Sequence, residues 1–298
     1  MTVLEKDQIL KDIEQSAKVV KTAAKFTEYS RVYPQTNEFL LSKYKNLENE
    51  RYQKALVVLA SGDQFLNLLM KGIKNFDTFD SNRMTEYYVM GVKIPALLNM
   101  TYEQYKKFYK TLLTPKVNED ELFAVIKAAD EKYKYFWEEF YRYYRERNGR
   151  NFRFNDLFIC DLENNYYNEY LYDSKDYQKM QSCLKEATIT FRHADITSVP
   201  TTFGQYDFID LSNILNYYKE IFCDSKNPRE MRKKLVTEIV SKNLVENGTL
   251  FYDYYLGAGF YKILSQIRTI PVENTDPFSI DCTYGFTLGL TKNKISNL

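Results

Sequence analysis

The chain has 298 residues, with 41 basic and 40 acidic side chains and a formal net charge of +1. This balance argues against a nucleic-acid footprint and against a polybasic membrane contact. Hydrophobic residues make up 44% of the sequence, which is enough for a substantial core. No apolar run approaches the ~20 residues that a membrane helix needs, and the charged N-terminus lacks a signal-peptide core. The sequence therefore predicts a cytoplasmic protein without a transmembrane segment, and leaves its oligomeric state open.

Metal and nucleophile chemistry has few candidates in this chain. His193 is the single histidine, so histidine-based metal sites and Ser-His-Asp triads lack their parts and no metal is expected. The cysteines are far apart and form no C-x-x-C pair, which favours buried free thiols. They are Cys160, Cys183, Cys223 and Cys282.

The N-terminal segment, residues 1–50, is predicted to be helical, with a break at Pro34. Tyr29 and Tyr33 stand at this break, just before the first predicted strand. Two aromatic rings here could cover a ligand, although packing in a loop is favoured on the pattern alone.

A strand–turn–helix–strand unit follows, and the rest of the chain is organised around it. The β-branched run at 55–60 is typical of a buried parallel strand. A turn at 61–63 leads into apolar residues with helical spacing from Phe65 to Ile73. A second short strand at 76–79 ends on the carboxylate of Asp80.

This unit has the spacing of a nucleotide site. Asp80 follows Gly62 by 18 residues, close to the ~20 expected between a nucleotide-binding turn and a ribose-binding acid. The helix start after Gly62 suits an anion. One glycine is a weak fingerprint for a dinucleotide, so a carboxylate-bearing nucleoside such as S-adenosylmethionine (SAM) fits better. An ordinary βαβ unit with a capped helix is the alternative interpretation.

A long helical region interrupts the α/β pattern. We expect residues 97–184 to be a mainly helical insertion into a core formed by 51–96 and 185–298. Its helical block 97–148 is expected to form a lobe beside the open end of the sheet and to shape an acceptor pocket. The aromatic stretch from Tyr133 to Arg145 is predicted to be a helix; its aromatic face indicates core packing more than an acceptor groove. After the insertion, strands are predicted at 187–192, 207–211, 249–254, 279–284 and 286–291, and helices at 228–244 and 259–267. The last two strands, joined at Gly285, are expected to form an antiparallel hairpin.

A mostly parallel sheet that ends in an antiparallel hairpin resembles the class I SAM-dependent methyltransferases, a Rossmann-like α/β fold. Four segments, in this order, resemble one branch of that fold. That branch includes the bacterial enzymes of betaine-lipid synthesis, which transfer the 3-amino-3-carboxypropyl group of SAM to diacylglycerol. The resemblance covers roughly 25–110 and 185–256. The segments are YSRVY at 29–33, LASGDQFLNLLMKG at 59–72, FDSN at 79–82 and YDFIDLSNILNYY at 206–218.

The resemblance implies a set of SAM contacts, carried over by position. Tyr29 and Tyr33 would cover the ligand, where a ring face favours the sulfonium cation. The methionine part would meet Ser61, Gly62 and Asp63. The ribose would lie on Asp80, beside Ser81 and Asn82. The adenine edge would contact Ala194, Asp195 and Ile196. The reaction side would be formed by Asp210, Leu211, Ser212 and Asn213.

Two functions are compatible with the sequence. The first is a SAM-dependent transferase that moves a methyl or a 3-amino-3-carboxypropyl group to a small-molecule or lipid-like acceptor, and not to nucleic acid. The N-P-P-Y type tetrapeptide of nucleic-acid methyltransferases is absent, and 210–213 stand in its place. Asp210, Tyr217 and His193 are candidates for assisting deprotonation, each equally consistent with a structural role. The second function is a non-catalytic protein that binds SAM or S-adenosylhomocysteine.

Overall fold

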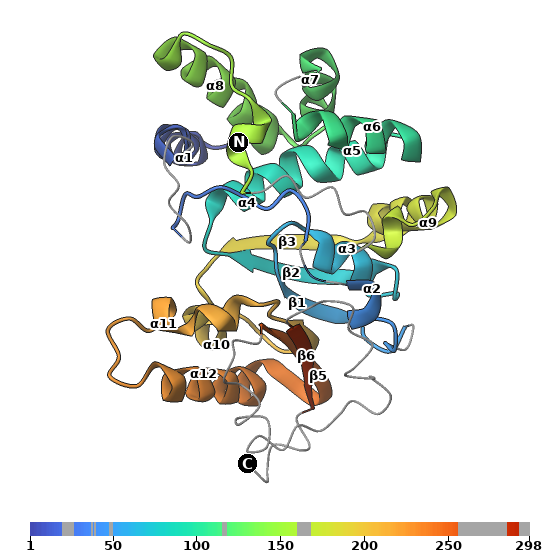
Figure 1. Ribbon diagram of the computed structural model, residues 1–298, viewed down its shortest axis with the longest axis vertical. Coiled ribbons are helices and arrows are strands. Elements are labelled where there is room, and N and C mark those ends of the chain that lie inside the picture. Colours follow the sequence, from blue (N-terminus) through green and yellow to red (C-terminus); the bar gives the residue numbers. More distant parts are fainter. Residues whose placement is uncertain are drawn as a thin grey trace.

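A six-stranded sheet forms the centre of the protein (Figure 1). The computed structural model describes residues 1–19, 27–36, 38, 40–47, 50–114, 118–159, 168–255 and 285–291. The strand order is β3-β2-β1-β4-β5-β6. The strands are β1 (Lys54–Val58), β2 (Asn75–Asp80), β3 (Thr188–His193), β4 (Tyr206–Asp210), β5 (Leu244–Tyr255) and β6 (Gly285–Thr291).

The first five strands are parallel, and β6 is antiparallel to β5. The protein therefore has the predicted α/β, Rossmann-like arrangement. Strands β1 to β4 lie within one or two residues of their predicted positions, because each is a short apolar or β-branched run. All carboxyl ends of the parallel strands meet at one edge of the sheet, which is where such folds bind ligands.

The C-terminal part of the sheet differs from the prediction in two ways. Residues 246–248 separate the predicted helix at 228–244 from the predicted strand at 249–254, and their Asn-Gly pair is typical of a turn. In the structure they belong to β5, where the register with β4 shifts and Asn247 takes a positive φ of 63°. A β-bulge thus absorbs the turn residues inside one long strand. The strand at 286–291 is confirmed as antiparallel, but its partner is β5. The predicted strand at 279–284 and helix at 259–267 lie outside the described residues.

Helices cover both faces of the sheet. Before β3 they are α1 (Val3–Val19), α2 (Leu40–Lys43), α3 (Asp63–Leu69), α4 (Arg83–Tyr88), the π-helical η1 (Val89–Lys93), α5 (Ile94–Asn99), α6 (Tyr102–Leu112), α7 (Glu119–Lys127), α8 (Glu131–Asn148), the 3₁₀ turns η2 (Phe154–Leu157) and η4 (Glu169–Leu171), and α9 (Ser174–Glu186). After β3 they are η5 (Ile196–Ser198), α10 (Val199–Thr202), η6 (Ile214–Tyr217), α11 (Tyr218–Ile221) and α12 (Pro228–Asn243). None of the helices in the described part combines the length and the hydropathy needed to cross a bilayer.

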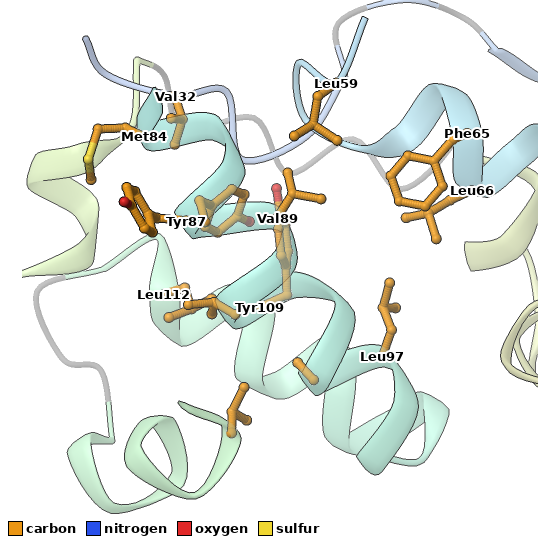
Figure 2. Close-up of a cluster of buried hydrophobic side chains, with 14 of the residues drawn as sticks. Val32, Leu59, Phe65, Leu66, Met84, Tyr87, Val89, Leu97, Tyr109 and Leu112 are labelled. Carbon is orange, nitrogen blue, oxygen red and sulfur yellow. The ribbon is translucent and has the colours of Figure 1, made fainter. Parts of the chain in front are cut away.

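The alternation of side chains along β1 divides the core in two. Ala55, Val57 and Leu59 join a large cluster with α1 and the helices from α3 to α9 (Figure 2). Leu56 and Val58 face the other side, where α10 and α12 pack. The helical insertion therefore shares one continuous core with a face of the sheet, and Figure 1 shows it gathered with α1 on that side. The division into residues 1–50, the two-part core and 97–184 stays a prediction.

The two cysteines in the described part are free, as expected, but neither is buried. Cys183 is half-buried on α9 and Cys223 is exposed. Cys160 and Cys282 lie outside the described residues.

A π-helical segment joins α4 to α5 and is closely packed by the insertion. The Trp137 indole on α8 donates a hydrogen bond to the Tyr87 carbonyl at 2.9 Å. Gly91 lies beneath this ring, and a Cβ added there would come within 2.8 Å of Trp137 Nε1 and 2.9 Å of Tyr133 Cβ. Only a glycine allows α8 to approach so closely.

We predict that Gly91→Ala destabilises the fold by about 1–3 kcal/mol, because the added methyl group overpacks the contact with Trp137. Helix propensity alone would give the opposite sign, a gain of about 1 kcal/mol. Denaturant unfolding measures the change. Gly204→Ala is the matched control, since a Cβ at Gly204 meets nothing within 4 Å. A Gly91→Ala variant more stable than the wild type would contradict the packing argument.

Candidate functional site

A cavity opens at the carboxyl ends of β1, β2 and β4, and it encloses about 810 Å³ of space free of protein atoms, part of it open to solvent. The chain leaves β1 and β4 on opposite sides of the sheet, so the cavity lies at the topological switch point of the fold. Among the residues predicted to bind a cofactor, seven line it: Tyr33, Ser61, Asp80, Ser81, Asn82, Ser212 and Asn213. Tyr217, one of the catalytic candidates, lines it as well.

Asp80 lies on the cavity wall, held from behind by two backbone amides. The Ala60 N–H donates to one carboxylate oxygen at 3.0 Å, and the Asn82 N–H donates to the other at 2.8 Å. Each oxygen keeps further lone pairs for a ligand. The carboxyl borders the cavity, and the residue is half-buried. Desolvation by burial raises the pKa of Asp80 to about 6, partly offset by these two hydrogen bonds.

The turn after β1 has two residues with positive φ, and it packs against the π-helical segment η1. Ala60 and Gly62 have positive φ values of 42° and 81°. A Cβ on Gly62 would come within 2.8 Å of Val89 Cγ1. The bare backbone of Gly62 therefore accommodates Val89, whereas the sequence suggested that it accommodates the ligand.

A strap formed by residues 27–36 covers the cavity. The Asn82 amide fixes the strap, accepting from the Ser30 N–H and donating to the Ser30 carbonyl, both at 3.1 Å. Val32 pairs with Phe158 of the insertion, which brings Ile159 onto the cavity wall. Tyr33 lines the cavity, but Tyr29 does not: its hydroxyl donates to Asp12 on α1 at 2.7 Å.

Arg31 stands between Tyr29 and Tyr33 in the sequence, in a position where it could cover a ligand. It lies on the strap and lines the cavity, and its Nε is buried without an acceptor in the described part of the chain. A guanidinium N–H in this position suits a carboxylate or another anion.

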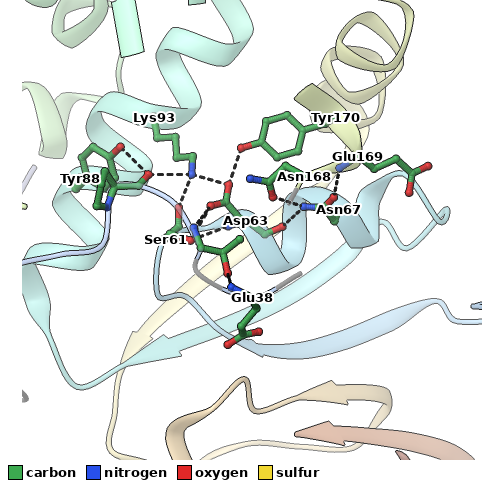
Figure 3. A network of polar contacts seen from close by, with 11 residues as sticks. Glu38, Ser61, Asp63, Asn67, Tyr88, Lys93, Asn168, Glu169 and Tyr170 are labelled. Carbon is green, nitrogen blue, oxygen red and sulfur yellow. Dashed lines mark hydrogen bonds and ion pairs between the residues drawn. The ribbon is translucent and has the colours of Figure 1, made fainter. Parts of the chain in front are cut away.

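Asp63 is fully buried in a separate network, away from the cavity wall (Figure 3). Its carboxylate accepts from Lys93 Nζ at 2.6 Å, from the Tyr170 hydroxyl at 2.5 Å and from the Thr36 N–H at 2.6 Å. Ser61 Oγ donates to the same carboxylate at 2.8 Å. The predicted contact of Asp63 with the methionine part of SAM is therefore not supported, because the protein itself occupies this carboxylate.

Lys93 is an unusual partner, a lysine buried in the middle of the protein. Besides Asp63, it donates to the Ser61 carbonyl at 2.8 Å and to the Pro34 carbonyl at 3.3 Å. Burial lowers the pKa of Lys93, and the carboxylate of Asp63 counteracts this. The ion pair joins the π-helical segment to the turn and to the strap.

Asp210, a candidate base, is likewise buried and occupied. It accepts from Lys43 Nζ at 2.9 Å, from the Tyr44 hydroxyl at 2.5 Å and from the Ser212 N–H at 2.7 Å. Leu211 packs in the second core cluster instead of lining the cavity. Ser212, with a positive φ of 51°, turns the chain toward the cavity.

Glu38 is the acidic cavity residue that the sequence did not single out. It lies on the strap side, is only 7% exposed and lines the cavity. Its carboxylate accepts from Lys43 Nζ at 3.1 Å, from Gln64 Nε2 at 3.4 Å and from Ser212 Oγ. It precedes α2 in an irregular segment, where no periodicity marks a residue as functional.

The remaining candidates lie differently from the expectation. His193 is exposed, with Nε2 at 2.8 Å from the Ser81 carbonyl. Asp195 accepts from the N–H and the hydroxyl of Thr197 as the cap of η5, while Ala194 and Ile196 join the second core cluster. None of these four side chains is among the cavity-lining residues. Tyr217 lines the cavity, and burial raises its pKa.

Comparisons with known proteins add little to this site. No protein-family model matches the sequence, and no curated protein matches it. Among solved structures, the chain is similar to the rRNA methyltransferase aviRa from Streptomyces viridochromogenes. The match has 11% sequence identity and a TM-score of 0.33, and it covers 96% of this chain and 84% of the other.

The raised pKa of Asp80 predicts a pH-dependent stability. The folded protein favours the protonated carboxyl, so this contribution is present below about pH 4 and is lost as the pH rises through about 6. In the wild type, the free energy of unfolding should fall by about 2–3 kcal/mol over this range because of Asp80. We expect this fall to be absent in Asp80→Asn.

The readout is the difference in slope between the two proteins, measured by urea denaturation from pH 4 to pH 7. The absolute level is not informative, since the amide nitrogen of asparagine replaces one carboxylate oxygen and cannot accept the hydrogen bond of its backbone N–H. Parallel curves for the variant and the wild type would show that Asp80 does not titrate in this range.

Proposed function

We propose that the cavity binds SAM or S-adenosylhomocysteine with the ribose hydroxyls on Asp80, and that the chain is a SAM-dependent transferase. One observation carries this proposal: a carboxylate at the carboxyl end of β2 lines a cavity at the switch point, with both oxygens oriented by backbone amides. A carboxylate in this place can accept from both hydroxyls of a ribose.

The residues present fit such a ligand in charge as well. The nucleoside end would meet Asp80, and the carboxylate of the amino-acid end would meet Arg31, whose Nε lacks an acceptor in the described chain. SAM, when bound, supplies its own leaving group, so the protein has mainly to align an acceptor with one carbon. Tyr33, on the strap, offers a ring that favours a cation nearby.

The acceptor in this proposal is a small or lipid-like molecule, and the transferred group is either methyl or 3-amino-3-carboxypropyl. Apolar side chains form part of the wall, among them Val58, Ile159 and Ile214. The balanced charge of +1 offers little electrostatic attraction for nucleic acid. Ile159 is the cavity-lining residue that comes from the insertion, and it lies outside the block 97–148 that was expected to shape the acceptor end.

A non-catalytic binding protein is the second candidate. Asp210 and His193 are not on the cavity wall, and the raised pKa of Tyr217 makes its phenolate scarce at neutral pH. Tyr217 is therefore suited to donating a hydrogen bond more than to accepting a proton. An acceptor that needs deprotonation would have to find another base.

We predict that Asp80→Ala weakens binding of S-adenosylhomocysteine by more than 1 kcal/mol, about fivefold or more, because two ribose hydroxyls lose a buried acceptor. Calorimetry measures the affinity. Asp77→Ala is the control on the same strand: Asp77 accepts hydrogen bonds from Thr190 and Tyr206 but does not line the cavity. Equal affinity of the Asp80 variant and the wild type would refute the ribose assignment.

The reaction itself is tested with SAM labelled separately in the methyl group and in the carboxypropyl group, incubated with cell extract and the protein. We expect label from the carboxypropyl group in a product, following the resemblance of the four segments. Label transferred only from the methyl group would make the chain a methyltransferase. Tight binding with no transfer of either label would favour the non-catalytic function.

A further inference from the structure

One corner of the cavity contains more hydrogen-bond acceptors than donors. Glu38 and Gln64 meet there, from the strap side and from α3, and both line the cavity. Their exposed fractions are 7% and 2%, so bulk water has little access to their polar atoms. In Figure 3 the Glu38 carboxyl points away from Asp63, although its backbone N–H joins the Asp63 network by donating to the Thr36 hydroxyl at 3.0 Å.

The charges in this corner are acidic on balance. Lys43 Nζ lies between two carboxylates, 3.1 Å from Glu38 and 2.9 Å from Asp210. In the described chain, it is the cation within ion-pair distance of Glu38. One ammonium thus serves two buried carboxylates, and a buried carboxylate is stabilised by further donors.

Gln64 adds an acceptor without a donor. Its Oε1 is buried and has no hydrogen-bond partner in the described part of the chain. The amide Nε2 donates to Glu38 at 3.4 Å and to Ser212 Oγ at 3.5 Å. Turning the amide around would put its oxygen against the Glu38 carboxylate, two acceptors with no proton between them. The missing partner of this corner is therefore a donor, and a positively charged one.

We propose that this corner binds a primary ammonium group of the ligand, with Glu38 as its counter-ion and Gln64 Oε1 as a second acceptor. The inference rests on the proposed function in that the ligand is the nucleoside donor or its acceptor. An ammonium has three N–H donors, which matches a site formed by several oxygens. A divalent metal fits less well, because it takes six or more oxygen ligands and Lys43 would repel it.

The ammonium could come from two sources, and two ligands separate them. S-adenosylhomocysteine carries the amino-acid end, whereas 5′-methylthioadenosine lacks it. If the donor supplies the ammonium, Glu38→Gln lowers the affinity for S-adenosylhomocysteine by about 10-fold or more, since a charge-assisted hydrogen bond is lost. The affinity for 5′-methylthioadenosine then stays unchanged. Calorimetry on the full chain gives both affinities.

If the acceptor supplies the ammonium, Glu38→Gln leaves both nucleosides unchanged. The wild type saturated with S-adenosylhomocysteine then binds ethanolamine, with ethylene glycol as the uncharged control, and Glu38→Gln abolishes that binding. Nucleoside affinities that do not change, together with no discrimination between ethanolamine and ethylene glycol, overturn the proposal. Failure of both nucleosides to bind the wild type would contradict the proposed function instead. Titration of the nucleoside-free protein with ethanolamine would then test by itself whether Glu38 and Gln64 bind an ammonium group.

Gln64→Met separates a ligand site from a structural role. The substitution removes an unpartnered acceptor at similar volume, so we expect the thermal midpoint to stay or to rise. The same substitution should lower the affinity for the ammonium-bearing ligand several-fold. A structural role predicts the reverse pattern, a lower midpoint with unchanged affinity, and this outcome would count against the proposal. Asn67→Ala on the same helix controls for disturbance of α3, because Asn67 bonds to Asn168 outside the cavity.

Discussion

The ion pair between Asp63 and Lys93 holds together the segments that form the cavity. Both side chains are almost completely excluded from solvent, and charges buried in this way must be paired. Satisfying them draws in the Ser61 carbonyl, the Thr36 N–H and the Tyr170 hydroxyl. The turn after β1, the π-helical segment, the strap and the insertion therefore meet at one carboxylate. Removing one member of such a pair typically costs about 3–5 kcal/mol.

Three aspartates near strand ends illustrate how surroundings decide the role of one residue type. Asp63 and Asp210 are each paired with a lysine and a tyrosine, which occupies their oxygens and keeps them structural. Asp80 is held by two backbone N–H groups and by a hydrogen bond from the Thr85 side chain, without a lysine partner in the described chain, and it borders the cavity. Desolvation raises its pKa, and its oxygens keep lone pairs on the cavity side. Under the proposed function, Asp80 is the ligand-binding member of the three.

The sequence predicted the elements set by local patterns, and it missed those set by distant partners. Strands β1 to β4 are short apolar or β-branched runs, which the local sequence pattern is enough to predict. The placement of Asp63 and Asp210 depends on Lys93, Lys43 and Tyr170, and no spacing rule links an aspartate to a lysine 167 residues away. Glu38 lies in an irregular segment, so its approach to Gln64 follows only from the fold. The bulge in β5 was hidden because Asn-Gly is ordinarily a turn signal.

The distribution of polar groups around the cavity has a further consequence for selectivity. Arg31 contributes a donor without an acceptor, and Gln64 an acceptor without a donor, on the walls of the same cavity. Each unmet group adds a desolvation cost to the free protein that a matching ligand would remove. A ligand carrying both a carboxylate and an ammonium relieves both costs, whereas a neutral nucleoside relieves neither. Under the proposed function, this discrimination rests on cavity groups without a partner in the described part of the chain, and it does not depend on whether the bound ligand then reacts.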